Sequence, residues 1–484
     1  MFDFPIRAQI TGELQDRAQL SWCRLHDQAL YGPSNVFKAQ DYDWPGDYEG
    51  RILLAWTKLS DLLERDSEYA SEMLRHYRAH CNCQGYFGPV RTGGTVDEQQ
   101  LAGHGWVLRS LAEYQILHSD AGLNDVAEKI VRNLCLPLVE ALAQYPISDG
   151  ERRTCGEVEG RSDRRIGSWL VSTDVGAVFI LFDGLLQAAK VFDLPARPVL
   201  DAMLNLAQRL DPLAVRAQTH ASLTLAHGLL RYDAVFGSPD AAALARRIYD
   251  LYRNCAVTEN FANYNWFGRP EWTEPCAMVD SFMVALELFR RTDETHYLDD
   301  AHRIWFSALE RAQRPNGGFG GENCLQIEDP VLYMRFYEAV NCCSMRGAEG
   351  LFERGRRTVW RKNRTLYLAI PTPGDFAFAD GLKIRVHTGY PLNNQWRVEI
   401  LQPGTTAVEH IQAYSVNGGW LTDPGPAEEF EDENRAIGDS GFYTVWRGPV
   451  MRGQAQDGTW QPVNALWKLT PAAAENLKLN MIFG

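Results

Sequence analysis

The stretch Arg51-Ile52-Leu53-Leu54-Ala55-Trp56-Thr57-Lys58-Leu59-Ser60-Asp61-Leu62-Leu63 carries the pattern that decides the fold. Its apolar residues recur close to every 3.6 positions, which is typical of a helix. Similar patterns recur at about 99–118, 124–144, 173–190, 197–210, 220–235, 239–254, 275–291, 294–312 and 344–355. Loops rich in Gly, Pro and Asn separate them. These helices predict either pairs that close into an (α/α)6 barrel or an open helical solenoid.

The pattern changes near residue 357. Five segments beyond this point are rich in β-branched and aromatic residues, partly alternate between apolar and polar residues, and are separated by turn residues: 358–360, 365–370, 382–387, 396–400 and 441–446. They predict an antiparallel β-sandwich of roughly 110 residues. The expected protein is therefore mainly α with a C-terminal all-β part, divided into a helical barrel at 1–355 and a β-sandwich domain at 356–484.

Composition excludes several classes of partner. The 484 residues include 48 basic and 62 acidic side chains, a net charge of −14, without the clustered Lys and Arg that nucleic acids require. No apolar run reaches the roughly 20 residues of a membrane helix, and Met1–Pro5 lacks the features of a signal peptide. We therefore expect a cytoplasmic protein with no membrane or nucleic-acid partner. A homo-oligomer stays an open alternative.

Ten cysteines are too few for a disulfide scaffold in a chain of this length. The strongest local signal is Glu274-Pro275-Cys276 together with the adjacent pair Cys342-Cys343. Three thiolates and a carboxylate can form a tetrahedral zinc site, although no Cys-x-x-Cys knuckle is present. The alternative is that both adjacent cysteines are small buried core residues.

Carboxylates are dense in one segment. Glu259, Glu271 and Glu274 lie among aromatic and amide residues, which suits a sugar site in which a carboxyl group protonates a leaving oxygen. A solvated acidic loop is the alternative. His104 and His220 stand near the starts of helical segments, where a barrel lines its substrate funnel. Each is either a substrate contact or a structural group.

Several of these residues fall in motifs that resemble a known family, the β-L-arabinofuranosidases of glycoside hydrolase family 127. The resemblance extends from about residue 46 to about residue 453. The stretches that carry it are Leu101-Ala102-Gly103-His104, Gln218-Thr219-His220, the segment from Thr258-Glu259-Asn260-Phe261 to Glu274-Pro275-Cys276, and Asn341-Cys342-Cys343.

The resemblance implies an (α/α)6 barrel with β-sandwich parts. It also implies a zinc-dependent, retaining, exo-acting glycoside hydrolase that cleaves a small oligosaccharide or glycoside. Glu274, Cys276, Cys342 and Cys343 would be the zinc ligands, with Cys342 also the nucleophile. Glu259 would be the general acid/base, and His104 and His220 would contact the sugar.

Two departures from the family pattern bear on the substrate. Pro275 stands where the family usually has Thr, which a first helical turn tolerates. Ser172-Thr173-Asp174-Val175 stands where the family often has His-Glu-Glu, so a sugar contact is changed. The alternatives are the same site acting on another pentose or deoxy sugar, or a degenerate, non-catalytic sugar-binding barrel.

Overall fold

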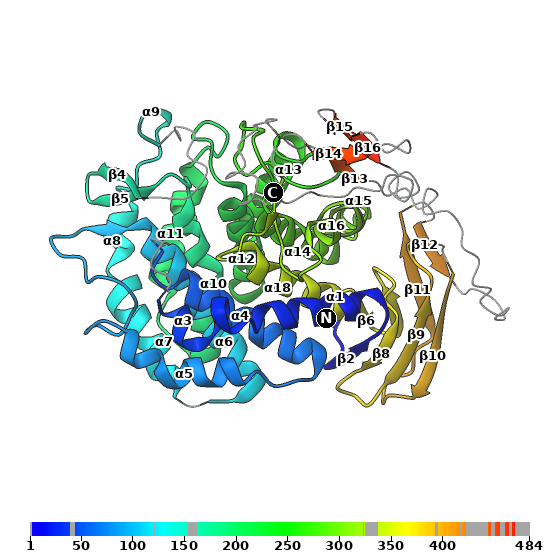
Figure 1. Ribbon diagram of the computed structural model, residues 1–484. Helices are drawn as coiled ribbons and strands as arrows, with labels where there is room; N and C mark the ends of the chain where they lie inside the picture. The colour runs from blue at the N-terminus through cyan, green and yellow to red at the C-terminus, as the bar shows by residue number, and fades with distance from the viewer. Residues whose placement is uncertain are drawn as a thin grey trace.

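The computed structural model describes residues 2–38, 44–120, 122–152, 162–322, 324, 337–392, 395–416 and 419–422, and short strands at 444–446, 451–454, 460–463 and 467–469. A helical body makes up most of the molecule, and most of the strands lie along one side of it (Figure 1). Within these ranges, no helix is both long enough and apolar enough to cross a membrane.

Six helices form a closed inner ring in which each packs against the next and the last packs against the first. In order they are α4 (Asp47–Leu63), α6 (Glu98–His118), α10 (Ile180–Phe192), α12 (Thr219–Phe236), α14 (Pro275–Thr292) and α18 (Cys343–Arg356). Nearly every residue of α4 and α18 is buried, which is the pattern of a helix surrounded by protein. The closure confirms the predicted (α/α)6 barrel and excludes the open solenoid.

A second layer of helices covers the ring. It consists of α1 (Glu13–Leu25), α5 (Glu68–His80), α7 (Leu123–Ile130) with η1 (Val131–Cys135) and α8 (Leu138–Leu142), α11 (Arg197–Arg209), α13 (Pro239–Cys255), and α15 (His296–Arg303) with η3 (Ile304–Leu309) and α16 (Glu310–Ala312). These helices bury one face only; α13, for example, buries Leu244, Ile248 and Tyr252 at helical spacing. Short helical turns occur at α2 (Gln28–Tyr31), α3 (Pro33–Val36), α9 (Asp149–Arg152) and η2 (Ala177–Phe179).

Two sheets form the β part, and both lie on the same side of the helical body (Figure 1). The five-stranded sheet has the order β1 (Phe2–Asp3), β6 (Val359–Lys362), β7 (Thr365–Leu368), β11 (His410–Ser415) and β12 (Gly419–Thr422). The four-stranded sheet has the order β10 (Trp396–Gln402), β9 (Lys383–Thr388), β8 (Gly374–Ala377) and β2 (Arg7–Ile10). Buried residues alternate with outward-facing ones along β7 and β9, as in strands with one covered face. One buried apolar core continues from the helices into these sheets.

The β part differs from the sequence-based expectation in two respects. The N-terminal strands β1 and β2 pair with β6 and β8, so residues 2–10 belong to the sheets although the predicted boundary placed 1–355 in the helical barrel. Strands this short give no local signal, and their partners lie more than 350 residues away in the chain. In addition, β7 and β11 pair in parallel within a sheet predicted to be antiparallel.

Smaller sheets complete the description. β3 (Val96–Asp97), β5 (Trp169–Ser172) and β4 (Ser162–Ile166) form a three-stranded sheet within the helical part. Near the C-terminus, β13 (Thr444–Trp446) pairs with β16 (Trp467–Leu469), and β14 (Met451–Gln454) pairs with β15 (Trp460–Val463). The rest of the strand predicted at 441–446, residues 441–443, lies outside the described residues.

Helices α6 and α10 cross at two glycines that let their backbones approach. A Cβ placed on Gly184 would lie 1.9 Å from the carbonyl oxygen of Gly105, and one placed on Gly105 would lie 2.5 Å from that of Ile180. Both neighbours are backbone atoms, which cannot rotate away. The crossing therefore depends on the absence of side chains at these two positions.

We expect Gly184→Ala to lower the free energy of unfolding by about 1–3 kcal/mol or more, because it overpacks the crossing. Urea unfolding of the whole chain measures the effect. The matched control is Gly150→Ala, since a Cβ there would meet no atom within 4 Å. Equal unfolding midpoints for the two variants would contradict the role assigned to the α6–α10 crossing.

Candidate metal centre and active site

All six inner helices begin at the same end of the ring, because outer helices run back between them. Each helix start offers unpaired N–H groups and a partial positive charge, which favour anionic side chains. The loops before these helices are joined at this end: the N–H of Gln218 donates to Val175, and that of Thr219 donates to Asn265. This end of the barrel therefore collects residues from distant parts of the chain.

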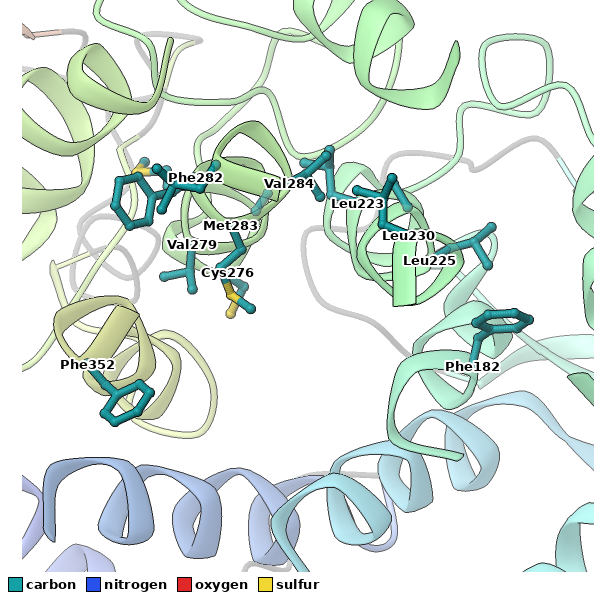
Figure 2. Close-up of a cluster of buried hydrophobic side chains, with 14 of the residues drawn as sticks. Phe182, Leu223, Leu225, Leu230, Cys276, Val279, Phe282, Met283, Val284 and Phe352 are labelled. Carbon is teal, nitrogen blue, oxygen red and sulfur yellow. The ribbon is translucent and has the colours of Figure 1, made fainter. Parts of the chain in front are cut away.

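Two of these helix starts supply four groups that can bind a metal ion. Glu274 is the N-cap residue of α14 and Cys276 lies in its first turn, while Cys342 is the N-cap residue of α18 and Cys343 is its first residue. One donor atom from each lies within 4.8 Å of all the others. Cys276 lies on the side of α14 that faces the middle of the ring (Figure 2). The structure thus brings together the four residues predicted as ligands.

The spacing of this cluster fits a four-coordinate metal ion. Cys276 Sγ lies 3.0 Å from Cys342 Sγ and 3.7 Å from Cys343 Sγ, and Cys342 Sγ lies 3.6 Å from Glu274 Oε1. Tetrahedral Zn–S bonds of about 2.3 Å place ligands roughly 3.8 Å apart. Among the described residues, the other carboxylate oxygen, Glu274 Oε2, is buried without a hydrogen-bond partner. A thiolate-rich donor set suits zinc and not calcium or magnesium.

The three thiols differ in charge and accessibility. Hydrogen bonds from Cys276 and Cys343 hold the pKa of the Cys342 thiol well below its ordinary value. Burial raises the pKa of the other two thiols, and it also raises the pKa of the Glu274 carboxyl. Cys342 is half-buried, whereas Cys276 and Cys343 are fully buried. Negative charge therefore concentrates on the most accessible sulfur.

Arg51 reaches the cluster from α4, on the far side of α18 from α14. Its Nη1 donates to Cys276 Sγ at 3.5 Å, its Nε donates to Asp47 Oδ2 at 2.8 Å, and its Nη2 lies 3.2 Å from His220 Nε2. In the sequence, Arg51 is only the start of an apolar run. Its burial follows from the fold, in which nearly every residue of α4 is covered, and no local signal in the sequence marks Arg51.

His220 lies beside the cluster, but protein groups use both of its ring nitrogens. Nδ1 donates to Asp280 Oδ2 at 2.5 Å, and Nε2 accepts from Arg51. Burial lowers the pKa of His220, so the ring is neutral. The Trp106 indole stacks on it at a centroid distance of 5.7 Å. The geometry makes His220 a link between Arg51 and Asp280. The sugar contact expected of His220 stays a prediction.

His104 lies in the second turn of α6 and is completely buried. Its Nδ1 donates to the Gln100 carbonyl at 2.6 Å, and its Nε2 accepts the Phe87 N–H at 3.0 Å. Both nitrogens therefore bind backbone, and the ring fastens the loop that contains Phe87 onto α6. The sugar contact expected of His104 from the sequence stays a prediction.

Glu259 is not a member of the thiol cluster. It lies in the turn closed by the hydrogen bond from Phe261 N–H to the Thr258 carbonyl, and its side chain is exposed. The hairpin that carries it is tied to the candidate metal cluster, because Asn263 Oδ1 accepts the backbone N–H of Glu274 at 3.0 Å. Glu259 thus stands at the tip of a hairpin whose base borders the cluster. Glu271 forms an ion pair with Arg269.

A set of buried polar side chains beside the cluster was not predicted from the sequence. Gln218 and Trp266 face each other in an antiparallel bridge, which puts their side chains on one face. Gln218 Oε1, Asp174 Oδ1 and both amide atoms of Asn265 are buried, without partners among the described residues. Burial, followed by the charge of Cys342, raises the pKa of Asp174 to about 7. Buried polar atoms are normally paired, so these atoms are candidates to bind a polar ligand.

The buried state of His104 predicts a pH dependence of stability. Burial lowers its pKa to about 4, whereas an unfolded histidine has a pKa of about 6.5. As the pH falls through this window the unfolded chain binds the proton first, so the free energy of unfolding decreases, by up to about 3 kcal/mol from this residue. We expect His104→Gln to reduce the loss of unfolding free energy between about pH 6.5 and pH 4, as measured by urea titrations at a series of pH values. The exposed His76→Gln is the control, and equal slopes for both variants would refute the assignment.

The cluster predicts stoichiometric metal binding. We expect the purified protein to bind one equivalent of zinc, and its cobalt-substituted form to show thiolate-to-cobalt charge-transfer absorption. Cys343→Ser should lower the zinc affinity by roughly tenfold or more, because it replaces a thiolate with a weak neutral donor. Cys135→Ser, which alters a buried cysteine in η1 outside the cluster, should leave the zinc content unchanged. Full zinc binding by Cys343→Ser would contradict the ligand set.

Comparison with known proteins places the fold. No family model and no curated protein sequence matches the chain. A β-arabinofuranosidase of glycoside hydrolase family 127 matches with a TM-score of 0.58 and 13% identity, over 96% of this chain and 79% of that one. A family-127 β-L-arabinofuranosidase from Geobacillus stearothermophilus T6 matches with a TM-score of 0.54 and 12% sequence identity, and the match covers 87% of this chain and 78% of that one. A third structure, described as a glycoside hydrolase, matches with a TM-score of 0.59 and 12% sequence identity, and the match covers 96% of this chain and 76% of that one. The chain therefore has the fold of these enzymes, which confirms the resemblance at the level of architecture.

Proposed function

We propose that this protein is a zinc-dependent, retaining glycoside hydrolase that removes a terminal β-L-arabinofuranoside or a similar furanoside. The observation that carries the proposal is the cluster of Glu274, Cys276, Cys342 and Cys343 at the end of the barrel where the helix starts converge. The fold shared with family-127 arabinofuranosidases supports the same conclusion. In this proposal the helical barrel is the catalytic domain.

Zinc held by these four residues would keep the thiols deprotonated at neutral pH, since a coordinated thiol loses its proton. Cys342 is the proposed nucleophile because it is the most accessible of the three cysteines and has the lowest pKa. Its position at the N-terminus of α18 further favours the thiolate.

The proposed reaction proceeds in two displacements. In the first, the Cys342 sulfur bonds to the anomeric carbon while the bond from that carbon to the glycosidic oxygen breaks, and Glu259 gives that oxygen a proton. In the second, Glu259 takes a proton from water, the water oxygen bonds to the anomeric carbon, and the sulfur leaves. Two inversions retain the anomeric configuration.

Glu259 is proposed as the acid/base because of its place at the rim. Its hairpin is anchored to Glu274 through Asn263, while its own side chain is exposed. An exo-acting enzyme holds the terminal sugar inside and lets the leaving group project outward. A carboxyl at the rim can therefore reach both the leaving oxygen and the incoming water.

The buried polar side chains of Asp174, Gln218 and Asn265 are the proposed contacts of the terminal sugar. Their unpaired carboxylate and amide atoms can bond several hydroxyl groups at once. The stretch Ser172–Val175, which contains Asp174, has no histidine where the resemblance leads one to expect one. This difference favours a second candidate, another pentose or a deoxy sugar at the same site.

We expect the zinc-loaded protein to hydrolyse p-nitrophenyl β-L-arabinofuranoside or a related p-nitrophenyl furanoside. Cys342→Ala should lower turnover by roughly a thousandfold or more, because it removes the nucleophile. Glu259→Gln should slow substrates with poor leaving groups far more than the p-nitrophenyl substrate, since p-nitrophenolate leaves without a proton. Release of p-nitrophenol and of free sugar measures both effects.

The matched control is Cys255→Ala, an exposed cysteine in α13. It should keep full activity. Absence of zinc together with absence of turnover on every furanoside tested would reject the hydrolase. A non-catalytic sugar-binding barrel would instead bind sugar with equal affinity before and after Cys342→Ala and hydrolyse none.

A further inference from the structure

Only one of the three thiols in the cluster receives a hydrogen bond from a cation. Arg51 Nη1 donates to Cys276 Sγ at 3.5 Å, and among the described residues no comparable bond from a cation reaches Cys342 or Cys343. A charge-assisted N–H···S bond withdraws electron density from a thiolate, which makes that sulfur a poorer nucleophile. The charge of Arg51 also lowers the pKa of the Cys342 thiol, but its hydrogen bond goes to Cys276, so Cys276 differs from the other two thiols in this direct contact.

The guanidinium of Arg51 is held in this position from several sides. Its Nε donates to Asp47 at 2.8 Å, its Nη2 lies 3.2 Å from His220 Nε2, and its carbon lies 4.4 Å from the centre of the Trp106 ring. Each of its three nitrogens faces a different partner. Arg51 therefore cannot turn toward Cys342 without losing several contacts.

The partners of Arg51 are themselves fixed by a buried chain of charges. His220 Nδ1 donates to Asp280 Oδ2 at 2.5 Å, and Arg346 Nη2 donates to the other oxygen of Asp280, also at 2.5 Å. All of these side chains are at least nine-tenths buried. This chain extends through the barrel interior from α4 through α12 and α14 to α18.

We propose that Arg51 is a positioning residue that holds Cys276 as a ligating but unreactive thiolate and so leaves Cys342 as the sulfur that attacks. The inference rests on the proposed function for the identity of the attacking group. It adds to that function the means by which one of three chemically identical ligands is selected. Arg51 does not touch the substrate in this role.

Alkylation with iodoacetamide tests the proposal, because the attacking sulfur displaces iodide in proportion to its nucleophilicity. Zinc-loaded protein is labelled to low conversion, and peptide mass spectrometry gives the ratio of label on Cys276 to label on Cys342. We expect a low ratio in the unchanged protein and a ratio roughly tenfold higher in Arg51→Gln, the scale typical for loss of a group that supports a metal ligand. Arg51→Lys should give an intermediate ratio, because an ammonium keeps the charge but not the planar fork.

Arg356→Gln is the matched control. Arg356 is also a buried arginine, but it lies at the opposite end of α18, where it pairs with Asp61 at 3.0 Å. This variant should keep the ratio of the unchanged protein. The urea midpoint of each variant shows that it is folded, and Arg51→Lys provides the comparison if Arg51→Gln does not fold.

Two results would overturn the proposal. An unchanged ratio in folded Arg51 variants would mean that burial alone protects Cys276. Loss of zinc with equal labelling of all three thiols would mean that Arg51 stabilises the whole cluster without selecting one sulfur.

Labelling needs no sugar, so it separates this proposal from the proposed function. The same ratios can be measured on reduced, metal-free protein. A protein that shows the expected ratios but hydrolyses no furanoside would reject the hydrolase and keep the role of Arg51. Turnover that depends on Cys342, together with a labelling ratio that stays unchanged in the Arg51 variants, would keep the hydrolase and reject the role of Arg51.

Discussion

Six inner helices that run in one direction bring six helix N-termini to one end of a closed ring, and the candidate site depends on this constraint. Each N-terminus presents unpaired N–H groups and partial positive charge. Glu274 and Cys342 occupy the N-cap positions of two neighbouring helices, α14 and α18. Ring closure therefore brings together residues that are 68 positions apart and places them where anionic groups are stabilised.

The ring also encloses charged side chains, and a buried charge is stable only when an opposite charge lies beside it. Arg109, Arg346 and Arg51 lie inside the barrel with Asp183, Glu349, Asp280 and Asp47 as partners. Removal of one member of a buried ion pair typically costs about 3–5 kcal/mol, because the other charge stays buried. Such a network holds its members in one arrangement. It links the candidate metal centre to the packing of the inner helices, so the site and the core are parts of one structure.

Local pattern was enough to predict most of the architecture. The helical periods and the change to alternating strands near residue 357 appear in the structure. The grouping of Glu274 and Cys276 with Cys342 and Cys343, which local pattern left open and the family resemblance implied, is present as well. The N-terminal strands were missed because two to four residues carry no periodic signal. His104 and His220 were correctly placed near helix starts, but the use of both ring nitrogens by protein groups depends on partners elsewhere in the fold.

The amino-acid sequence by itself determined which segments are helices and strands, because periodicity and turn residues act locally. It also supplied three cysteines and a glutamate as candidate ligands. Only the tertiary structure decided that Arg51 donates to Cys276, that polar atoms of Asp174, Gln218 and Asn265 are buried, and that Asp174 lies near enough to Cys342 to feel its charge. These contacts join helices and loops that are far apart in the chain. They form because closure of the ring leaves each buried charge and polar group few partners within reach.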